Sequence, residues 1–296
     1  MKTPQYYILR IREKFKRIRK ELDRAYARWR INMALARGAA SASLRRIDPT
    51  DPSSWEFSGF SQNGEDGVID FLLSHLKTQN RYFIEIAASN GLENNTSWLA
   101  IVRRYSGVMV EGDPVLSQQC RENFESLNWG LQIVNARVTC DNIQDVITRS
   151  SYKNPDLFSL DIDGIDYYVM KEFLRLGLRP KIIVVEYNSA FGPEASIAVE
   201  YKKDFDIGKE HPKRLYFGAS ISGWRRFFSR QSYQFVAVDQ NGVNAFFVDS
   251  SEFDPDFIKR IRGSEFHENF ALRCQHGSSW QGQFEMIKTC KFVEIE

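Results

Sequence analysis

Four oxygen-bearing side chains directly follow two short apolar runs: Asp161, Asp163, Glu186 and Asn188. Adjacent parallel strands would bring them to one crevice at the carboxyl edge of a sheet. Carboxylate and amide oxygens suit a hard divalent cation such as Mg2+ or Mn2+, and a carboxylate can also act as the general base that deprotonates a hydroxyl nucleophile. In a purely structural interpretation, Asp163 and Asp166 cap the following helix. All three interpretations stay open at the level of sequence.

A third candidate general base, His211, lies in the segment 189–217, which shows no clear periodicity. A loop of this length inside a compact domain is usually a lid or a substrate-binding loop. A lone loop histidine is, however, more often simply exposed. The candidate catalytic residues are therefore Asp161, Asp163 and His211.

A second chemical signal is the turn that follows the apolar run 83–86. Its small residues let a ligand approach the backbone, and we expect Gly91 to be the residue that adopts a positive φ freely. A helix is expected to start near Asn94, so run, turn and helix form the nucleotide-binding opening of a doubly wound sheet. Glu111 ends the next apolar run, twenty-six positions after Glu85, where an acid accepts hydrogen bonds from ribose hydroxyls.

The turn also indicates what kind of nucleotide it binds. It lacks the G-x-G-x-x-G spacing and contains no cationic side chain, which argues against a pyrophosphate ligand. S-adenosylmethionine fits instead, because it combines a ribose, an adenine and a zwitterionic tail without phosphates.

The sequence Glu85-Ile-Ala-Ala-Ser-Asn-Gly91 followed by Glu111 resembles motifs I and II of class I S-adenosylmethionine-dependent methyltransferases. The runs Ser61-Gln-Asn-Gly-Glu-Asp66 and Asn94-Asn-Thr96 are similar to the FkbM-like branch, many of whose members methylate sugars. The resemblance covers roughly residues 60–250, with Ala87 and Ser89 departing from the family's usual residues. It implies a set of cofactor-binding residues: Gln62, Glu85, Ala87, Asn90, Gly91, Asn95, Thr96, Glu111, Asp113, Asn135, Ala136 and Asp161.

Several of these residues also have structural interpretations. Glu85 could be a buried acid bonded to nearby backbone N–H groups, and Gln62 could belong to an exposed helix start. Asn135 could form a plain turn. Asp161 could bind a cation, act as the general base, or contact the amine of the cofactor's methionine moiety.

The elements that position these residues follow from the apolar runs. Strands are expected near residues 83–86, 107–110, 131–134, 157–160, 181–185, 233–238 and 244–248, with helices between the first five. The predicted fold is α/β and Rossmann-like, the class I methyltransferase fold. It has a seven-stranded, mostly parallel sheet with an antiparallel last strand, and an N-terminal amphipathic helix precedes it.

The charge of the 296-residue chain is unevenly distributed, although its net value is only +2. Residues 1–37 hold twelve Lys or Arg and three acids, a net of +9, which leaves −7 for the remainder. Apolar residues from Ile8 to Met33 recur every three or four positions and predict one amphipathic helix. Three interpretations compete: packing on its own domain or on a second subunit, docking on anionic lipid, and, least favoured, nucleic-acid binding.

These patterns divide the chain into four segments: the basic helix 1–37, a linker 38–54, the methyltransferase domain 55–250 and a C-terminal extension 251–296. The four cysteines show no metal-ligand spacing and no disulfide-like density. No segment is apolar enough for a membrane span or a signal peptide. A cytoplasmic location is expected, with a peripheral contact at the cytosolic membrane face as an option.

The favoured function is O-methylation of a sugar hydroxyl, in a glycan or a lipid-linked glycan precursor, by S-adenosylmethionine, with Mg2+ or Mn2+ as an optional aid. The alternative is a non-catalytic binding or scaffold protein that retains the fold, which the departures at Ala87 and Ser89 favour. A dehydrogenase is disfavoured by the missing glycine fingerprint.

Overall fold

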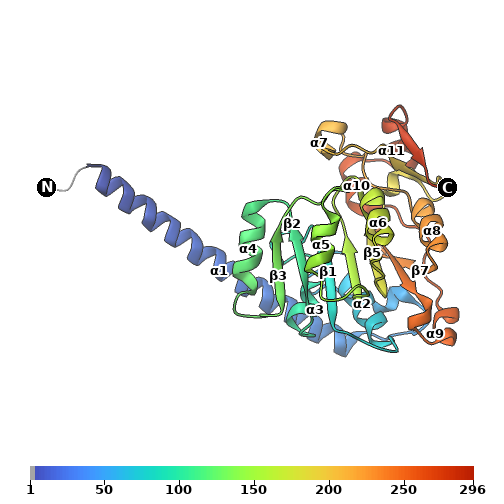
Figure 1. Cartoon of the computed structure of the whole chain (residues 1–296), viewed down its shortest axis with the longest axis horizontal. Coiled ribbons are helices and arrows are strands. Elements are labelled where there is room, and N and C mark those ends of the chain that lie inside the picture. The colour runs from blue at the N-terminus through green and yellow to red at the C-terminus, as the bar shows by residue number, and fades with distance from the viewer. Residues whose placement is uncertain (1–3) are drawn as a thin grey trace.

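The computed structural model describes residues 4–296, so the first three residues of the predicted basic helix lie outside the described part. Seven strands form one sheet in the order β3-β2-β1-β4-β5-β8-β7 (Figure 1). The strands are β1 (Tyr82–Ile86), β2 (Ser106–Glu111), β3 (Leu131–Asn135), β4 (Leu157–Leu160), β5 (Ile182–Glu186), β7 (Tyr233–Val238) and β8 (Asn244–Asp249). The first five run parallel, and β8 is antiparallel to both β5 and β7. The predicted Rossmann-like α/β fold is therefore confirmed.

Helices cover both faces of the sheet because successive strand residues point to opposite sides. Ile84 packs in one buried cluster with α5, α6 and α8, whereas Phe83 packs in the other with α2, α3, α4 and α9. The helices of the domain are α2 (Glu65–Ser74), α3 (Ser97–Ile101), α4 (Pro114–Phe124), α5 (Ile143–Arg149), α6 (Asp166–Arg175), α7 (Ile207–Glu210), α8 (Ile221–Arg230), α9 (Pro255–Arg260), α10 (Phe270–His276) and α11 (Trp280–Ile287). Short 3-10 turns are η1 (Pro52–Trp55), η2 (Ser189–Phe191) and η3 (Ser250–Glu252).

The antiparallel strand follows from a hairpin between β7 and β8. Gly242 adopts a φ of +72° in its turn. The buried carboxylate of Asp239 accepts hydrogen bonds from the backbone N–H groups of Asn241, Val243 and Asn244. This arrangement brings Val243 and Asn244 to the same sheet edge as the carboxyl ends of the parallel strands.

The segment 189–217 is held by the C-terminal extension. Its strand β6 (Ile197–Val199) pairs antiparallel with β9 (Phe292–Glu294). The hydroxyl of Tyr216 also donates a hydrogen bond to the carbonyl of Lys291. Residues of the extension, among them Ile287 and Ile295, are buried in the core. The C-terminal extension therefore packs on the same core as the residues before it, which local sequence patterns do not indicate.

The N-terminal helix α1 (Pro4–Leu44) is longer than predicted and includes part of the expected linker. Three alanines follow Gly38 in the last turns, and alanine has the highest helix propensity. Gly38 itself packs on the domain, since a Cβ there would lie 2.2 Å from Cη2 of Trp98. The first half of α1 projects beyond the sheet, as Figure 1 shows.

Within the described residues, no helix combines the length and the apolar character needed to cross a membrane.

Candidate functional site

Two adjoining cavities lie at the carboxyl edge of the sheet, and both are lined by Ile86, Ala87 and Asp161. The larger, of about 280 Å3, extends from Glu111 past Ala136 to Phe205. The smaller, of about 110 Å3, extends towards Gln62 and Asn244. Ligands of doubly wound sheets bind in this crevice, beyond the carboxyl ends of the strands.

Glu111 ends β2 and faces the larger cavity, as predicted. Its carboxylate accepts hydrogen bonds from the backbone N–H groups of Ser89 (2.8 Å) and Asp113 (2.7 Å). Because a carboxylate offers about four acceptor positions, Glu111 can hold the turn and still accept a bond from a ligand hydroxyl.

The turn between β1 and α3 adopts a left-handed backbone at three positions: φ is +66° at Ala87, +52° at Ser89 and +75° at Gly91. Gly91 has the positive φ expected of it, and Ala87 and Ser89 adopt the same conformation although they tolerate it less freely. The turn keeps a glycine-like shape at Ala87 and Ser89 even though a Cβ makes it unfavourable.

Glu85 faces the smaller cavity but is mainly a structural acid. It is buried and accepts hydrogen bonds from the backbone N–H of Asn95 (2.9 Å) and from the hydroxyl of Thr96. Burial raises the pKa of Glu85 to about 7, against the opposing effect of these bonds. Thr96 is itself fully buried against Glu85, whereas Asn95 lines the cavity.

The start of α2 is organised by Asp66, whose buried carboxylate accepts three backbone hydrogen bonds, from Gly59, Phe60 and Ser61. This loop places Gln62 and Asn63 on the smaller cavity. Glu65, also on the cavity, accepts hydrogen bonds from the side chains of Asn63 (3.0 Å) and Asn244 (2.7 Å).

Five residues of the predicted cofactor set line neither cavity in the described structure: Asn90, Gly91, Thr96, Asp113 and Asn135. Gly91 packs on α4, where a Cβ would lie 2.4 Å from Phe124, and Asn90 faces a separate cavity between α1 and α4. Asp113 caps the N-terminus of α4. The amide of Asn135 donates to the carbonyl of Glu111, whereas the predicted residue Ala136 lines the larger cavity.

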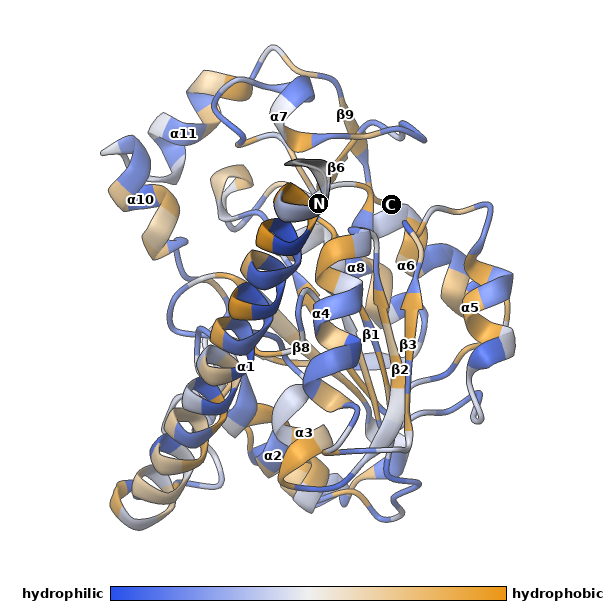
Figure 2. Ribbon diagram, turned by 90° about the vertical axis from the view of Figure 1, so that its left-hand side faces the viewer, coloured by the Kyte–Doolittle hydropathy of each residue, from blue (hydrophilic) through white to orange (hydrophobic). Residues whose placement is uncertain are grey.

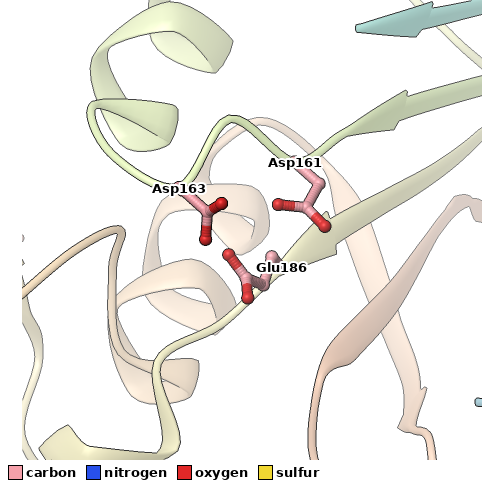
Figure 3. A group of neighbouring side chains, drawn as sticks. All are labelled: Asp161, Asp163 and Glu186. Carbon is pink, nitrogen blue, oxygen red and sulfur yellow. The ribbon is translucent and has the colours of Figure 1, made fainter. Parts of the chain in front are cut away.

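Asp161, Asp163 and Glu186, called the acid triad below, converge from β4 and β5, and Figure 3 shows their carboxylates pointing toward one another. One oxygen of each lies within 4.8 Å of the others. Burial, and then the charges of Asp163 and Asp166, raises the pKa of Asp161 to about 8. Burial and then the charge of Asp161 raise the pKa of Glu186 well above its usual value.

Two further groups act on the acid triad. Asp166 at the start of α6 accepts hydrogen bonds from the N–H groups of Ile162 and Gly164, each at 2.9 Å, and so fixes the loop that carries Asp163. Asp163 adopts a φ of +52° in this loop. Burial raises the pKa of Asp163, and the positive charge of Arg214 opposes that shift.

Asn188 does not join the acid triad, which corrects its assignment as a metal ligand. Its amide donates to the carbonyls of Leu215 (2.8 Å) and Phe217 (3.0 Å), and its oxygen accepts from the N–H of Ala190 (3.0 Å). Both amide N–H groups and one acceptor position of Asn188 therefore hold the segment 189–217.

His211 is not brought to the crevice either. It follows α7, and its Nδ1 accepts a hydrogen bond from the N–H of Lys213 (3.3 Å). In the described part of the chain, His211 lines neither cavity. The structure therefore gives no basis for its assignment as the general base.

Sequence reasoning missed several residues that line the cavities. In the larger cavity these include Arg137, Ile162, Lys203 and Phe205, and in the smaller one Asn63, Glu65, Ser159, Val243 and Asn244. Ser159 was detectable in principle, because it is a polar residue inside an apolar strand. Phe205 and Asn244 reach the site only through long-range packing, which has no local signal.

No protein-family model matches the chain, and no curated protein sequence matches it. Among solved structures, an O-methyltransferase from Bacillus cereus in complex with S-adenosylhomocysteine is similar at 18% identity and a TM-score of 0.41, over 74% of this chain and 88% of that one. The O-methyltransferase TomG from Streptomyces achromogenes, in complex with S-adenosylmethionine, is similar at 14% identity and a TM-score of 0.43, over 73% and 95%. Similarities this weak do not identify a substrate. The fold is assigned from the strand order of the sheet.

Proposed function

We propose that this chain is an S-adenosylmethionine-dependent methyltransferase that methylates a hydroxyl oxygen of a sugar. The observation that carries the proposal is the pair of joined cavities, with Glu111 in one and a polar set around Glu85 in the other. A nucleoside fits the first cavity, where Glu111 would accept the ribose hydroxyls. The zwitterionic amino-acid end fits the second, among Gln62, Asn63 and Asn95.

The acid triad, of which Asp161 lines both cavities and Asp163 the larger one, has the ligand types of a divalent-cation site. Glu186 Oε2 is buried and has no hydrogen-bond donor, and a buried carboxylate oxygen needs a proton or a cation. Asp161, Asp163 and Glu186 would hold Mg2+ or Mn2+, which prefer such oxygens. When bound, the cation would lower the pKa of an acceptor hydroxyl.

The chain's own residues account for the proton in the reaction. S-adenosylmethionine supplies an electrophilic methyl group on a positively charged sulfur. As the acceptor oxygen forms its bond to that methyl carbon, the carbon–sulfur bond breaks and its electron pair stays on sulfur. In the metal-free protein Asp161, which lines both cavities, takes the hydroxyl proton, and its pKa of about 8 makes its ionised form a stronger base than an ordinary aspartate.

One support for a sugar acceptor is the set of sequence motifs that resemble the FkbM-like branch. Another is the carboxylates of the acid triad, because carboxylates can bind adjacent hydroxyls of a sugar ring. A non-catalytic binding protein of the same fold is the second candidate, favoured by Ala87 and Ser89 in the motif turn. The backbone is left-handed at both positions, as it would be with glycine. This shape of the turn is compatible with ligand binding in the methyltransferase and in the non-catalytic binding protein alike.

Transfer of a labelled methyl group from S-adenosylmethionine to a panel of sugars and glycosides, with and without Mg2+, tests the proposal. We expect labelled product, and a loss of roughly 100-fold or more in rate for Asp161→Asn, the usual scale for a general base. Asp145→Asn, an exposed change on α5, serves as the matched control. Binding of S-adenosylmethionine without transfer to any acceptor would favour the non-catalytic binding protein. Absence of binding would contradict the methyltransferase and leave a scaffold protein that retains the fold.

A further inference from the structure

The N-terminal helix α1 carries an apolar stripe that no described part of the chain covers. Its members are Ile8, Ile11, Phe15, Ile18, Leu22, Tyr26, Trp29 and Met33, each between 37% and 68% exposed. At a rise of 1.5 Å per residue the stripe is about 38 Å long. Figure 2 shows hydrophobic and hydrophilic segments alternating along α1.

A different face of α1 contacts the domain. Ala27, Ala34 and Gly38 are buried there, and Arg30 donates to the carbonyl of Leu92 (3.1 Å). Lys20 adds an ion pair with Glu122 (3.1 Å). At 100° per residue, this docking face lies about 140° around the helix from the apolar stripe. The docked helix therefore presents the stripe away from its own domain.

Cations border the stripe. On the same helical wheel, Arg12 and Arg19 lie along one edge and Lys14 along the other, with Arg10 and Arg28 beyond it. All five side chains are exposed. An apolar stripe flanked by cations and containing Trp and Tyr is the arrangement of a helix that lies flat in a lipid headgroup layer.

Pairing of two copies through this stripe is opposed by the same cations. If Ile8, Phe15 and Leu22 occupy heptad position 'a' of a coiled coil, Arg12 and Arg19 occupy position 'e' and Lys14 occupies position 'g'. In a parallel pair, Lys14 would then face Arg19 of the second copy, which is a like-charge contact. An anionic surface has the complementary charge.

We propose that α1 docks this protein on an anionic lipid surface, lying parallel to it with the apolar stripe inserted. Burial of the stripe supplies the apolar contribution, and each Lys or Arg near the surface adds an electrostatic one that weakens as salt is raised. The inference is independent of methyl transfer, because the stripe faces away from the domain.

Flotation of the full-length protein with vesicles tests this inference. We expect the wild type to float with equimolar phosphatidylcholine and phosphatidylglycerol, and not with phosphatidylcholine alone. Phe15→Glu combined with Leu22→Glu abolishes flotation. Arg12→Gln combined with Arg19→Gln lowers partitioning roughly 25-fold, since each cation contributes about fivefold. Lys153→Gln combined with Lys259→Gln, the same charge change on the domain surface, leaves it unchanged.

The molar mass in solution, measured by light scattering, separates lipid docking from helix pairing. We expect the wild type and Phe15→Glu/Leu22→Glu to have the same mass, with unchanged thermal unfolding of the domain. A wild type that fails to float with anionic vesicles would overturn the proposal. A dimer that dissociates in the Phe15→Glu/Leu22→Glu variant would overturn it too and would assign the stripe to helix pairing.

Discussion

Asp161 and Glu186 directly follow the paired residues Leu160 and Val185 of β4 and β5, so the parallel register brings their carboxylates to the same point of the sheet edge. Their oxygens approach within 4.8 Å of each other and of Asp163, and Glu186 Oε2 has no donor. Glu186 is buried and Asp161 is half-buried, and two like charges at this separation destabilise the fold unless they share a proton or bind a cation. The proposed chemistry and the first prediction both rest on this relationship.

The stability of the metal-free protein should depend on pH through the acid triad. The pKa of Asp161 is raised to about 8, whereas an aspartate in an unfolded chain titrates at about 3.9. Because the folded state binds this proton more tightly, the free energy of unfolding falls as the pH rises from about 4 to about 8. Glu186→Gln removes the like charge and should stabilise the metal-free protein at pH 8 by on the order of 1–3 kcal/mol.

Urea unfolding at several pH values, in the presence of a chelator, measures this effect. Other buried carboxyls with raised pKa values contribute to the wild-type profile, so the difference between wild type and Glu186→Gln isolates the acid triad. When the chelator is replaced by Mn2+, the urea midpoint of the wild type should rise and that of Glu186→Gln should stay nearly unchanged. Parallel pH profiles for the two proteins would rule out this electrostatic account.

Asn188 should affect stability and not metal affinity. Asn188→Ala leaves the buried carbonyls of Leu215 and Phe217 without their donor, which costs roughly 1–3 kcal/mol for each unsatisfied group. Thermal unfolding should show this loss, while Mn2+ titration of the folded variant gives nearly the wild-type affinity. Asp161→Asn is the comparison that should lose Mn2+ binding. A selective loss of Mn2+ affinity in Asn188→Ala would restore Asn188 as a ligand.

Ala87→Gly should stabilise the protein. A left-handed backbone costs an L-residue about 1–2 kcal/mol, and Ala87 has a φ of +66°. The entropic cost of glycine offsets about 0.5–1 kcal/mol of the gain, so a net rise in the free energy of unfolding is expected. Ala88→Gly, at a buried neighbour without positive φ, should destabilise. Equal destabilisation by both changes would show that the turn is not strained at Ala87.

Gly38→Ala should loosen α1 from the domain. Helix propensity alone predicts stabilisation by about 1 kcal/mol, but a Cβ at this position meets Trp98 at 2.2 Å. We expect the packing clash to dominate, with faster amide hydrogen exchange across residues 34–44. Slower exchange would mean that propensity decides and that the contact with Trp98 is not close.

The sheet could be predicted from the sequence because its determinants are local. Apolar runs mark the buried strands, as in 83–86, which contains Glu85, and in 107–110, which Glu111 ends. The acid triad followed from the same logic, since Asp161 and Glu186 end neighbouring strands. The antiparallel last strand followed from the runs 233–238 and 244–248, which only a short turn separates.

Side-chain direction and loop placement could not be predicted in this way. Asn188 lies two residues after Glu186, the last residue of β5, yet its amide bonds the carbonyls of Leu215 and Phe217, which lie far along the chain. Phe205 packs on the ring of Tyr216, which contacts Phe292 in β9, the last strand, and these contacts join distant parts of the chain. For α1, the sequence predicted the apolar stripe but not that small residues on another face would contact the domain.

Calorimetric titration of S-adenosylmethionine into the wild type, Glu111→Gln and Glu125→Gln tests the central claim most directly. Glu111→Gln keeps one acceptor for the turn and removes the charge that would hold the ribose, whereas Glu125 is an exposed glutamate at the end of α4. We expect binding to the wild type and to Glu125→Gln, and an affinity lower by roughly tenfold or more in Glu111→Gln, the scale of one charged hydrogen bond. Absence of binding to the wild type, or equal affinity in all three proteins, would contradict the proposed cofactor site.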